Sequence, residues 1–188
     1  MFTGIVKGRA RLEAVADQDG VRSLTLRFPG GSLAQLTRGA SVSIDGVCLT
    51  AVSFDTEMAR FDCIDETLAL TTLGERVVGD AVNFERAAAF GDEIGGHLLS
   101  GHVVGTAEVV SRTERAGNLE LLLRMPTEHT KHVLPKGYVA LDGISLTVGR
   151  VEDDIFSVHL IPETRTVTTI DAKQVGDRVN LEVDAMTQ

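Results

Sequence analysis

The chain has 188 residues, of which 43% are hydrophobic and 24% are charged, with a formal net charge of −9 and a pI near 5.0. This composition is ordinary for a globular protein, and the length suits one large domain or two small ones. The acidic balance argues against a nucleic-acid surface or an anionic membrane surface, because both require clusters of Lys and Arg.

Targeting signals are also missing from the sequence. No apolar run approaches the length of a membrane span, and residues 1–6 resemble a strand and not a signal peptide. The two cysteines, Cys48 and Cys63, are expected to be reduced and buried, and they cannot form a zinc site alone. We therefore expect a cytoplasmic protein.

Taken in order, the chain is a series of short strands separated by turn signals. Residues 2–15 form the first predicted strand, and residues 21–28 alternate so that Leu24, Leu26 and Phe28 share one face. Further strands are predicted at 41–44, 57–64 and 81–85, then at 119–125, 138–141, 155–161 and 178–183, with another opening after each Asp-Gly turn. About six short strands per half predict a small closed barrel or a sandwich. A barrel of this size is filled by its own side chains, so a ligand is expected at its rim.

Two short helices interrupt this pattern. They are predicted at Ser32–Arg38 and Thr127–Leu134, each opened by a hydroxyl residue at the N-cap. Gly39 and Gly137 follow as stop signals.

The clearest feature of the sequence is an internal repeat. Asp45-Gly46-Val47-Cys48-Leu49-Thr50 returns as Asp142-Gly143-Ile144-Ser145-Leu146-Thr147, a numbering difference of 97 that also aligns identical residues from Gly4/Gly101 to Glu85/Glu182. Two tandem copies of one domain are therefore predicted, residues 1–97 and 98–188. The linker, residues 90–102, lacks a flexible composition, so the copies should be joined closely.

The linker also carries candidate functional groups. Its glycines lack the spacing and the basic residue of a phosphate-binding loop, and a tight turn between domains is preferred. His97 and His102 have no third metal ligand beside them. His102 occupies the repeat position of Ile5, and an imidazole in place of an apolar side chain favours a hydrogen-bonding or acid–base role.

The repeat leaves two questions open. Cys48 and Ser145 are candidate nucleophiles, but no G-x-S-x-G motif or adjacent base accompanies them, so packing beside a turn is favoured on residues alone. Thr50 and Thr147, and the Glu-Thr pairs at 66–67 and 163–164, occur in both copies. They either bind a polyhydroxylated ligand or hold turns together.

Several motifs occur in a fixed order from Met1 to about Asp184: residues 1–6, 45–50, 92–102, 142–147 and 160–164. Together they resemble the riboflavin synthases, the lumazine-binding double-barrel family. The resemblance implies an all-β fold of two tandem, six-stranded, antiparallel Greek-key barrels with short helices. It also implies a transferase reaction in which two molecules of 6,7-dimethyl-8-ribityllumazine give riboflavin and 5-amino-6-(ribitylamino)pyrimidinedione, without a cofactor or metal.

The resemblance further implies two lumazine sites. The first barrel would line one of them with Gly4, Ile5, Val6, Cys48, Leu49, Thr50, Asp62, Cys63, Ile64, Asp65, Glu66 and Thr67, and with Ser41 nearby. The second barrel would line the other with Gly101, His102, Val103, Lys136, Ser145, Leu146, Thr147, Leu160, Ile161, Pro162, Glu163, Thr164 and Arg165. Candidates for a catalytic role are His102, Cys48, Ser145 and Ser41, with Asp142 and Asp184 in proton handling.

Partners follow from the same resemblance: a small-molecule substrate and product, no nucleic acid and no membrane. The family is homotrimeric, with its working site between the N-terminal barrel of one chain and the C-terminal barrel of a neighbour. This chain stops at Gln188 without the family's C-terminal helix, so a monomer or weaker assembly is the other expectation. Asp65 and Val47 differ from residues common in the enzymes.

Two other functions are compatible with the family. One is a non-catalytic lumazine-binding or antenna protein, although the intact His102, Ser145 and Thr147 favour the enzyme. The other is a truncated enzyme that binds ligand and turns over slowly.

Overall fold

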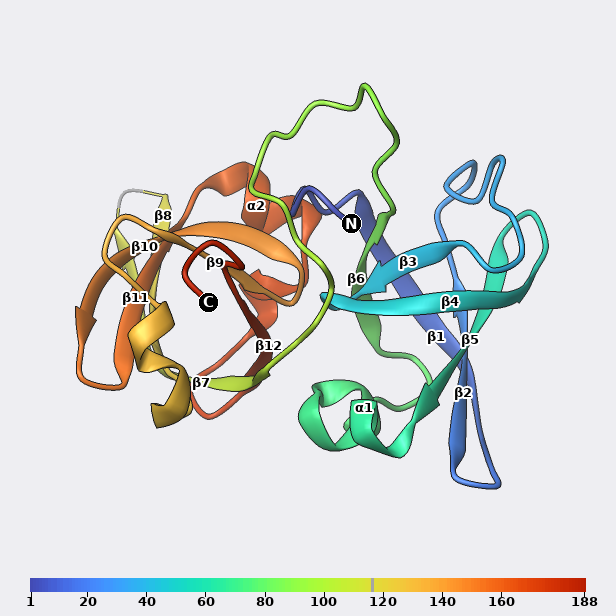
Figure 1. Ribbon diagram of the computed structural model, residues 1–188, viewed down its shortest axis with the longest axis horizontal. Coiled ribbons are helices and arrows are strands. Elements are labelled where there is room, and N and C mark those ends of the chain that lie inside the picture. The colour runs from blue at the N-terminus through green and yellow to red at the C-terminus, as the bar shows by residue number, and fades with distance from the viewer. Residues whose placement is uncertain (116) are drawn as a thin grey trace.

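Two closed antiparallel barrels of six strands each lie side by side in this computed structural model, which describes residues 1–115 and 117–188 (Figure 1). The predicted double-barrel fold is thus confirmed. None of the helices in the described residues is long and apolar enough to cross a membrane.

The first barrel is closed in the order β1-β2-β5-β4-β3-β6. Its strands are β1 (Gly8–Gln18), β2 (Val21–Arg27), β3 (Ser41–Ile44), β4 (Val47–Phe54), β5 (Met58–Ile64) and β6 (Ala81–Arg86). The second barrel repeats this circular order with β7 (Gly105–Arg115), β8 (Asn118–Arg124), β9 (Tyr138–Leu141), β10 (Ile144–Glu152), β11 (Ile155–Leu160) and β12 (Arg178–Val183).

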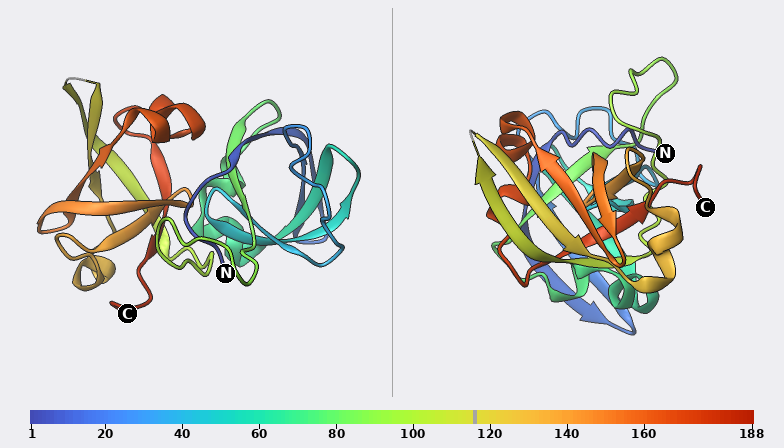
Figure 2. Two further views of the ribbon diagram at one scale, coloured as in Figure 1. Left: turned by 90° about the horizontal axis from the view of Figure 1, so that it is seen from above. Right: turned by 90° about the vertical axis from the view of Figure 1, so that its left-hand side faces the viewer.

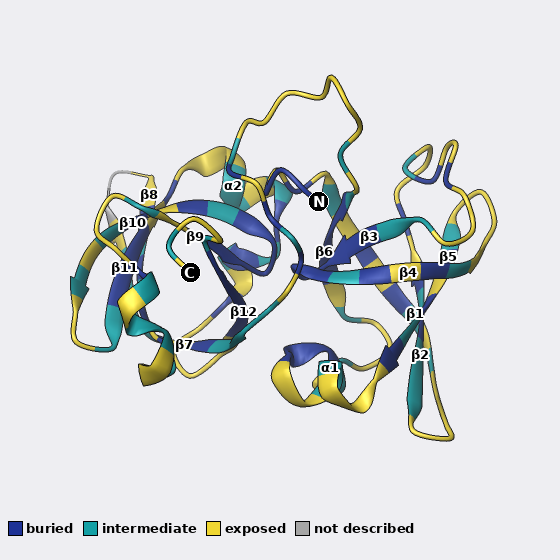
Figure 3. Ribbon diagram, in the orientation of Figure 1, coloured by how far each residue is buried: buried dark blue, intermediate teal, exposed yellow. Residues whose placement is uncertain are grey.

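Each barrel is filled by its own apolar side chains, as the alternating pattern predicts. In the first barrel Leu24, Leu26 and Phe28 all point inward, and the rings of Phe28 and Phe84 meet edge to face at 5.0 Å. Burial alternates along β4, β5, β8 and β10, whereas β3, β6, β9 and β12 are buried on consecutive residues. The linker between the barrels is largely exposed (Figure 3). The barrel interiors therefore leave little room for a ligand.

Helices are short and differ from the prediction. The segment 32–38 forms turns and no helix, because Gly31 and Gln35 take positive φ values of 82° and 61°. The second predicted helix is a 3₁₀ helix, η2 (Thr127–His132), with Pro126 at its N-cap and no side-chain cap. The positive φ after it belongs to Lys136 and not to Gly137.

Two further short helices follow the fifth strand of each barrel, where turns were predicted. They are α1 (Asp65–Leu70) and η1 (Thr72–Glu75) in the first barrel, and α2 (Pro162–Val167) and η3 (Ile170–Ala172) in the second. The Thr71 hydroxyl donates to the carbonyl of Thr67, and the Thr168 hydroxyl donates to the carbonyl of Thr164. These bonds close the last turn of α1 and of α2.

The two Asp-Gly turns meet back to back between the barrels. A Cβ atom on Gly46 would lie 2.7 Å from the backbone nitrogen of Gly143, so only glycine fits at this contact. Two asparagines bridge the same interface. Asn83 donates to the carbonyl of Asp142 at 3.0 Å, and Asn180 donates to the carbonyl of Asp45 at 2.8 Å.

Candidate functional site

The segments before each barrel cross over to the other barrel. Phe2 and Leu99 exchange backbone hydrogen bonds of 2.8 and 3.0 Å between the barrels. Beyond this bridge Val6 packs into the core of the second barrel, whereas Val103 packs against the core of the first. The N-terminus accordingly lies between the barrels (Figure 2).

This crossing brings two predicted segments against the opposite barrel, while the ligand that each of them lines stays a prediction. Residues 4–6 were expected to line the ligand of the first barrel, and residues 101–103 that of the second. The Ser145 N–H donates to the carbonyl of Gly4 at 2.9 Å, and the Cys48 N–H donates to the carbonyl of Gly101 at 3.0 Å. The physical reason is that residues 2–7 do not continue the first strand: Gly4 turns at a φ of +74°, and β1 begins only at Gly8.

Glycine is required where each crossing segment meets its turn. A Cβ atom on Gly4 would lie 2.5 Å from the Cβ of Ser145, and one on Gly101 would lie 2.5 Å from the Cβ of Cys48. Real Cβ atoms do not approach so closely, and both glycines take positive φ. The backbone at Gly4 and Gly101 therefore lies in close contact with Ser145 and Cys48, the positions at which the repeat changes from thiol to hydroxyl.

A hollow of about 200 Å³ beside Cys48 gathers many of the predicted residues of the first site. It is lined by Val47, Cys48, Glu66, Thr67, Leu70, Thr71, Gly101, His102 and Val103. Cys48 is half-buried there and His102 is exposed. Exposed His102 and half-buried Cys48 are therefore both accessible to a ligand in this hollow.

Other predicted residues of the first barrel lie outside that hollow. Leu49 and Cys63 point into the barrel core, and burial raises the pKa of the Cys63 thiol to about 11. Asp62 accepts a hydrogen bond of 2.7 Å from Ser23 on β2. Ser41 pairs with Thr50 across β3 and β4. This pair lies at the end of β3 away from the Asp45-Gly46 turn, whereas Ile44 and Val47 form the pair next to the turn.

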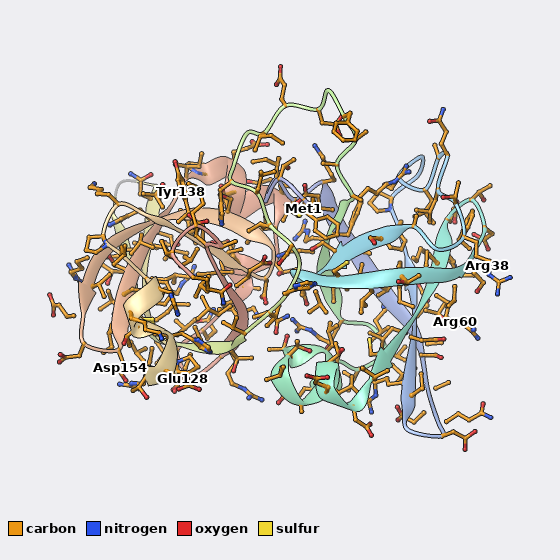
Figure 4. The ribbon with its side chains drawn as sticks, viewed as in Figure 1. Met1, Arg38, Arg60, Glu128, Tyr138 and Asp154 are labelled. Atoms are coloured by element: carbon orange, nitrogen blue, oxygen red, sulfur yellow. The ribbon has the colours of Figure 1, made fainter. Side chains whose placement is uncertain are left out.

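The second barrel contains a histidine–serine pair that the sequence did not predict. The Nδ1 atom of His97 lies 2.7 Å from the Oγ of Ser145, and its ring stacks on Tyr138 at 5.1 Å and 21°. Figure 4 labels Tyr138 on the second barrel and Met1 between the barrels. His97 is buried, and within the described chain its Nε2 has no hydrogen-bond partner. Nδ1 of His97 is thus within hydrogen-bond distance of Ser145, and its Nε2 is left for another partner.

Burial controls the charge of this histidine. Loss of hydration lowers the pKa of His97 below its ordinary value, while the negative charges of Asp184 and Glu182 act in the opposite direction. A neutral imidazole next to a serine hydroxyl can accept its proton. Sequence comparison within the chain missed His97 because the first copy begins at Met1 and has no counterpart for it.

The remaining predicted residues of the second site divide in a similar way. Leu146 and Leu160 are buried in the barrel core, while Thr147, Ile161, Pro162, Glu163 and Lys136 are exposed. Thr164 accepts at its carbonyl the hydroxyl of Thr168 and so belongs to the end of α2. Arg165 is bound to Asp171 at 2.6 Å and to Glu114, so its guanidinium serves an ion-pair cluster.

The two aspartates proposed for proton handling have different surroundings. Asp142 is fully buried, accepts the Asn180 N–H at 2.7 Å and lies 3.3 Å from the Lys173 ammonium. Oδ1 of Asp142 therefore accepts a hydrogen bond, while within the described residues Oδ2 is paired with Lys173 and accepts no hydrogen bond. Asp184 caps the C-terminal turn through the Met186 N–H at 3.0 Å and is the charge that most favours protonation of His97.

No group of three or more His, Cys, Asp or Glu side chains that could hold a metal occurs in residues 1–115 and 117–188.

Comparisons with known proteins give a consistent family. The profile described as "Lumazine binding domain" matches twice, at residues 3–87 and 100–184. A riboflavin synthase of Escherichia coli (strain K12) is 46% identical over 100% of this chain and 89% of its own length. A riboflavin synthase of Chlamydia muridarum is 42% identical over 100% of this chain and 92% of its own.

Solved structures agree with the sequence relatives. The crystal structure of LumP with riboflavin has a TM-score of 0.89 and 28% identity, and covers 98% of this chain and 100% of that chain. The structure of LumP with 6,7-dimethyl-8-(1'-D-ribityl) lumazine has a TM-score of 0.88 and 25% identity, and covers 98% and 99%.

Proposed function

The chain belongs to the riboflavin synthase family of lumazine-binding proteins, and on that premise we propose that it converts two molecules of 6,7-dimethyl-8-ribityllumazine into riboflavin and 5-amino-6-(ribitylamino)pyrimidinedione. The observation that carries the proposal is the repeated site: each barrel offers an Asp-Gly turn with a polar side chain, completed by a segment from the other half of the chain. A reaction between two identical molecules requires such a pair of sites, since proximity and orientation supply much of its rate.

The two copies differ where the two substrates have different roles. The 7-methyl group of the lumazine is acidic because its carbanion spreads into the pteridine ring. His97 and Ser145 form the pair best suited to remove that proton, with the serine hydroxyl relaying it to a neutral imidazole. We therefore place the deprotonated lumazine in the second barrel and the acceptor beside Cys48 and His102.

The ligand contacts follow the crossed arrangement. In the first site Cys48, Thr50, Glu66, Thr67 and the segment 101–103 would hold one lumazine. In the second site Ser145, Thr147, residues 161–164 and the segment 4–6 would hold the other, with Lys136 exposed for contact with an incoming ring. Backbone groups would meet the pyrimidine edge, and hydroxyls would meet the ribityl chain.

The working site is proposed to form between chains of a homotrimer. Apolar side chains at both candidate sites support this arrangement, because Ile5, Ile64 and Ile161 are exposed by 40 to 59% in the single chain. A cytoplasmic location is supported by Cys48 and Cys63, which are both free thiols.

The proposal is tested by incubating the protein with 6,7-dimethyl-8-ribityllumazine and following the riboflavin absorbance, with the molecular mass measured in the same buffer. One riboflavin should appear for two lumazines consumed, and the mass should be that of a trimer. Tight binding of lumazine without its consumption would instead favour a non-catalytic binding protein, the function compatible with the likeness to LumP.

A further inference from the structure

Two buried glutamates occupy equivalent positions in the last strand of each barrel. Glu85 on β6 is 3% exposed, and Glu182 on β12 is 5% exposed. A carboxylate in such a place must be compensated by hydrogen-bond donors, because its hydration is lost. The donors in both cases come from a crossing segment.

The contacts of the two carboxylates are nearly the same. Oε1 of Glu85 accepts the N–H and the hydroxyl of Thr3 at 2.6 and 2.7 Å, and its Oε2 accepts the Gly4 N–H at 3.0 Å. Oε1 of Glu182 accepts the N–H and the hydroxyl of Ser100 at 2.7 and 2.8 Å, and its Oε2 accepts the Gly101 N–H at 3.1 Å. Each glutamate therefore fixes two consecutive peptide groups.

The Thr3 and Ser100 hydroxyls each bind the backbone of one further residue. The Ile5 N–H donates to the Thr3 hydroxyl at 3.2 Å, and the His102 N–H donates to the Ser100 hydroxyl at 3.2 Å. His102 is exposed in the hollow beside Cys48, and its backbone N–H is held by the Ser100 hydroxyl. Its placement thus depends on Ser100, which in turn depends on Glu182.

Each glutamate binds a segment that also contacts the barrel that does not contain the glutamate. The Gly4 N–H binds Glu85 of the first barrel, and the Gly4 carbonyl binds Ser145 of the second. The Gly101 N–H binds Glu182 of the second barrel, and the Gly101 carbonyl binds Cys48 of the first. Gly4 therefore links Glu85 to Ser145, and Gly101 links Glu182 to Cys48.

We infer that Glu85 and Glu182 are positioning residues for the reaction, and that each sets the geometry of the site on the opposite barrel. Glu182 holds His102 against the first site, and Glu85 holds Gly4 and Ile5 against Ser145. The inference rests on the proposed function for its kinetic consequence, but its structural consequence can be measured without any turnover.

The structural test uses the Cys48 thiol as a reporter. Glutamine at position 182 keeps the size of the side chain but presents an amide N–H to a backbone N–H, which releases the segment 100–103. In the full chain, Glu182→Gln should raise the rate at which Cys48 reacts with 5,5′-dithiobis(2-nitrobenzoate) several-fold. Glu85→Gln should leave this rate unchanged, as should the exposed control Glu152→Gln. Equal effects of Glu85→Gln and Glu182→Gln, or no effect of either, would overturn the crossed arrangement.

The kinetic test uses the same variants with 6,7-dimethyl-8-ribityllumazine. A displaced catalytic group costs on the order of 100-fold in rate, so Glu182→Gln should lower kcat by about that factor with a smaller change in KM. Ser100→Ala should reproduce the loss, and Ser100→Thr should restore the rate because Thr3 fills this position in the first copy. A loss that falls on KM alone, or that Ser100→Thr does not relieve, contradicts a positioning role.

The controls separate the possible failures. If the wild-type protein makes no riboflavin, the proposed function fails, while the thiol rates still decide the crossed arrangement. If Glu182→Gln does not fold, as judged by its thermal transition, Ser100→Ala is measured in both assays in its place, with the same outcomes.

Discussion

Ser145 and its repeat counterpart Cys48 differ chiefly in the side chain that faces them. Ser145 has the imidazole of His97 at 2.7 Å, and the ring of Tyr138 covers that histidine. Cys48 borders a hollow that contains His102 and Glu66. We propose that the exchange of thiol for hydroxyl reflects this difference in the neighbouring side chains.

Replacement of His97 tests the proton relay. We expect His97→Gln to lower kcat by about 100-fold, the lower end of the usual contribution of a general base. Because burial lowers the pKa of His97, the acid limb of the wild-type pH–rate profile should lie below pH ~6.5, the ordinary histidine value. Measurement of kcat between pH 5 and 9 gives both quantities.

The matched control is His159→Gln, since His159 is an exposed histidine on β11. It should leave kcat and the pH profile unchanged. An acid limb that survives in His97→Gln at its original pH would assign the titrating base to another group.

The two thiols should differ sharply in reactivity. Burial raises the pKa of Cys63 to about 11, so almost no thiolate is present there at pH 8. We expect one thiol per folded chain to react with 5,5′-dithiobis(2-nitrobenzoate), two in denaturant, and none in folded Cys48→Ser. Two reactive thiols in the folded protein would contradict the placement of Cys63 in the core.

At this scale the sequence predicted the positions that differ between repeats but not their partners. Cys48, Ser145 and His102 were found because each could be compared with its counterpart. His97, Glu85 and Glu182 were not predicted as functional residues. His97 has no counterpart in the first copy, and Glu85 and Glu182 are the same residue at equivalent positions, so comparing the two copies shows no difference there.

Among the elements, the Asp-Gly turns do more than reverse the chain. Three of them take similar positive φ values at both residues: Asp19-Gly20, Asp45-Gly46 and Asp142-Gly143. The first is exposed at the tip of the β1–β2 hairpin, whereas the other two pack against each other between the barrels. Turns of similar backbone conformation are therefore exposed at the β1–β2 hairpin and buried between the barrels.

This contrast gives a test of the interface. Gly46→Ala and Gly20→Ala share the cost of a positive φ, about 1 to 2 kcal/mol. Only Gly46→Ala also drives a Cβ into the backbone of Gly143, which adds an overpacking cost of about 1 to 3 kcal/mol. Urea denaturation of both variants measures the difference, and equal losses of unfolding free energy would show that the two turns do not touch.

Strands were predicted better than helices because turn residues mark the ends of the strands. Turn signals and alternation placed β2, β3, β5, β6 and β12 within a residue or two of their ends. The helix at 32–38 was wrong because a hydroxyl followed by apolar residues does not reveal the positive φ of Gln35. The crossing of residues 2–7 was missed because an apolar segment with glycines suits a strand and a bridge equally well.

In the whole molecule, the barrels are joined by polar groups as well as by exchanged segments. Asp45 is fully buried, accepts the Asn83 N–H at 2.7 Å and pairs with Arg76 at 2.7 Å. Burial, reinforced by the nearby negative charge of Asp142, raises the pKa of Asp45 to about 6.

The domain boundary between residues 97 and 98 stays a prediction. A boundary at that position would assign His97 and Ser145, which lie 2.7 Å apart, to different domains.

The buried carboxyl group predicts a pH dependence of stability. Because its folded-state pKa is raised, Asp45 contributes stability that is present below its ordinary pKa of about 3.9 and is lost as the pH rises through about 6. The stability difference between wild type and Asp45→Asn should therefore shrink by roughly 2 kcal/mol between pH 4 and 7. Unfolding free energies across this range provide the measurement.

The exposed residue Asp19 supplies the control, because it occupies the same kind of Asp-Gly turn. Asp19→Asn should show no comparable change with pH. A constant difference between wild type and Asp45→Asn would mean that Asp45 is ionised in the folded protein throughout.

The number of ligands bound per chain tests the paired sites most directly. Equilibrium dialysis with riboflavin should give two bound molecules per chain, one in each barrel. Thr50→Phe and Thr147→Phe, both at exposed positions beside the turns, should each reduce the number to one. A single ligand per wild-type chain, abolished by one of these substitutions and unaffected by the other, would contradict the use of both barrels.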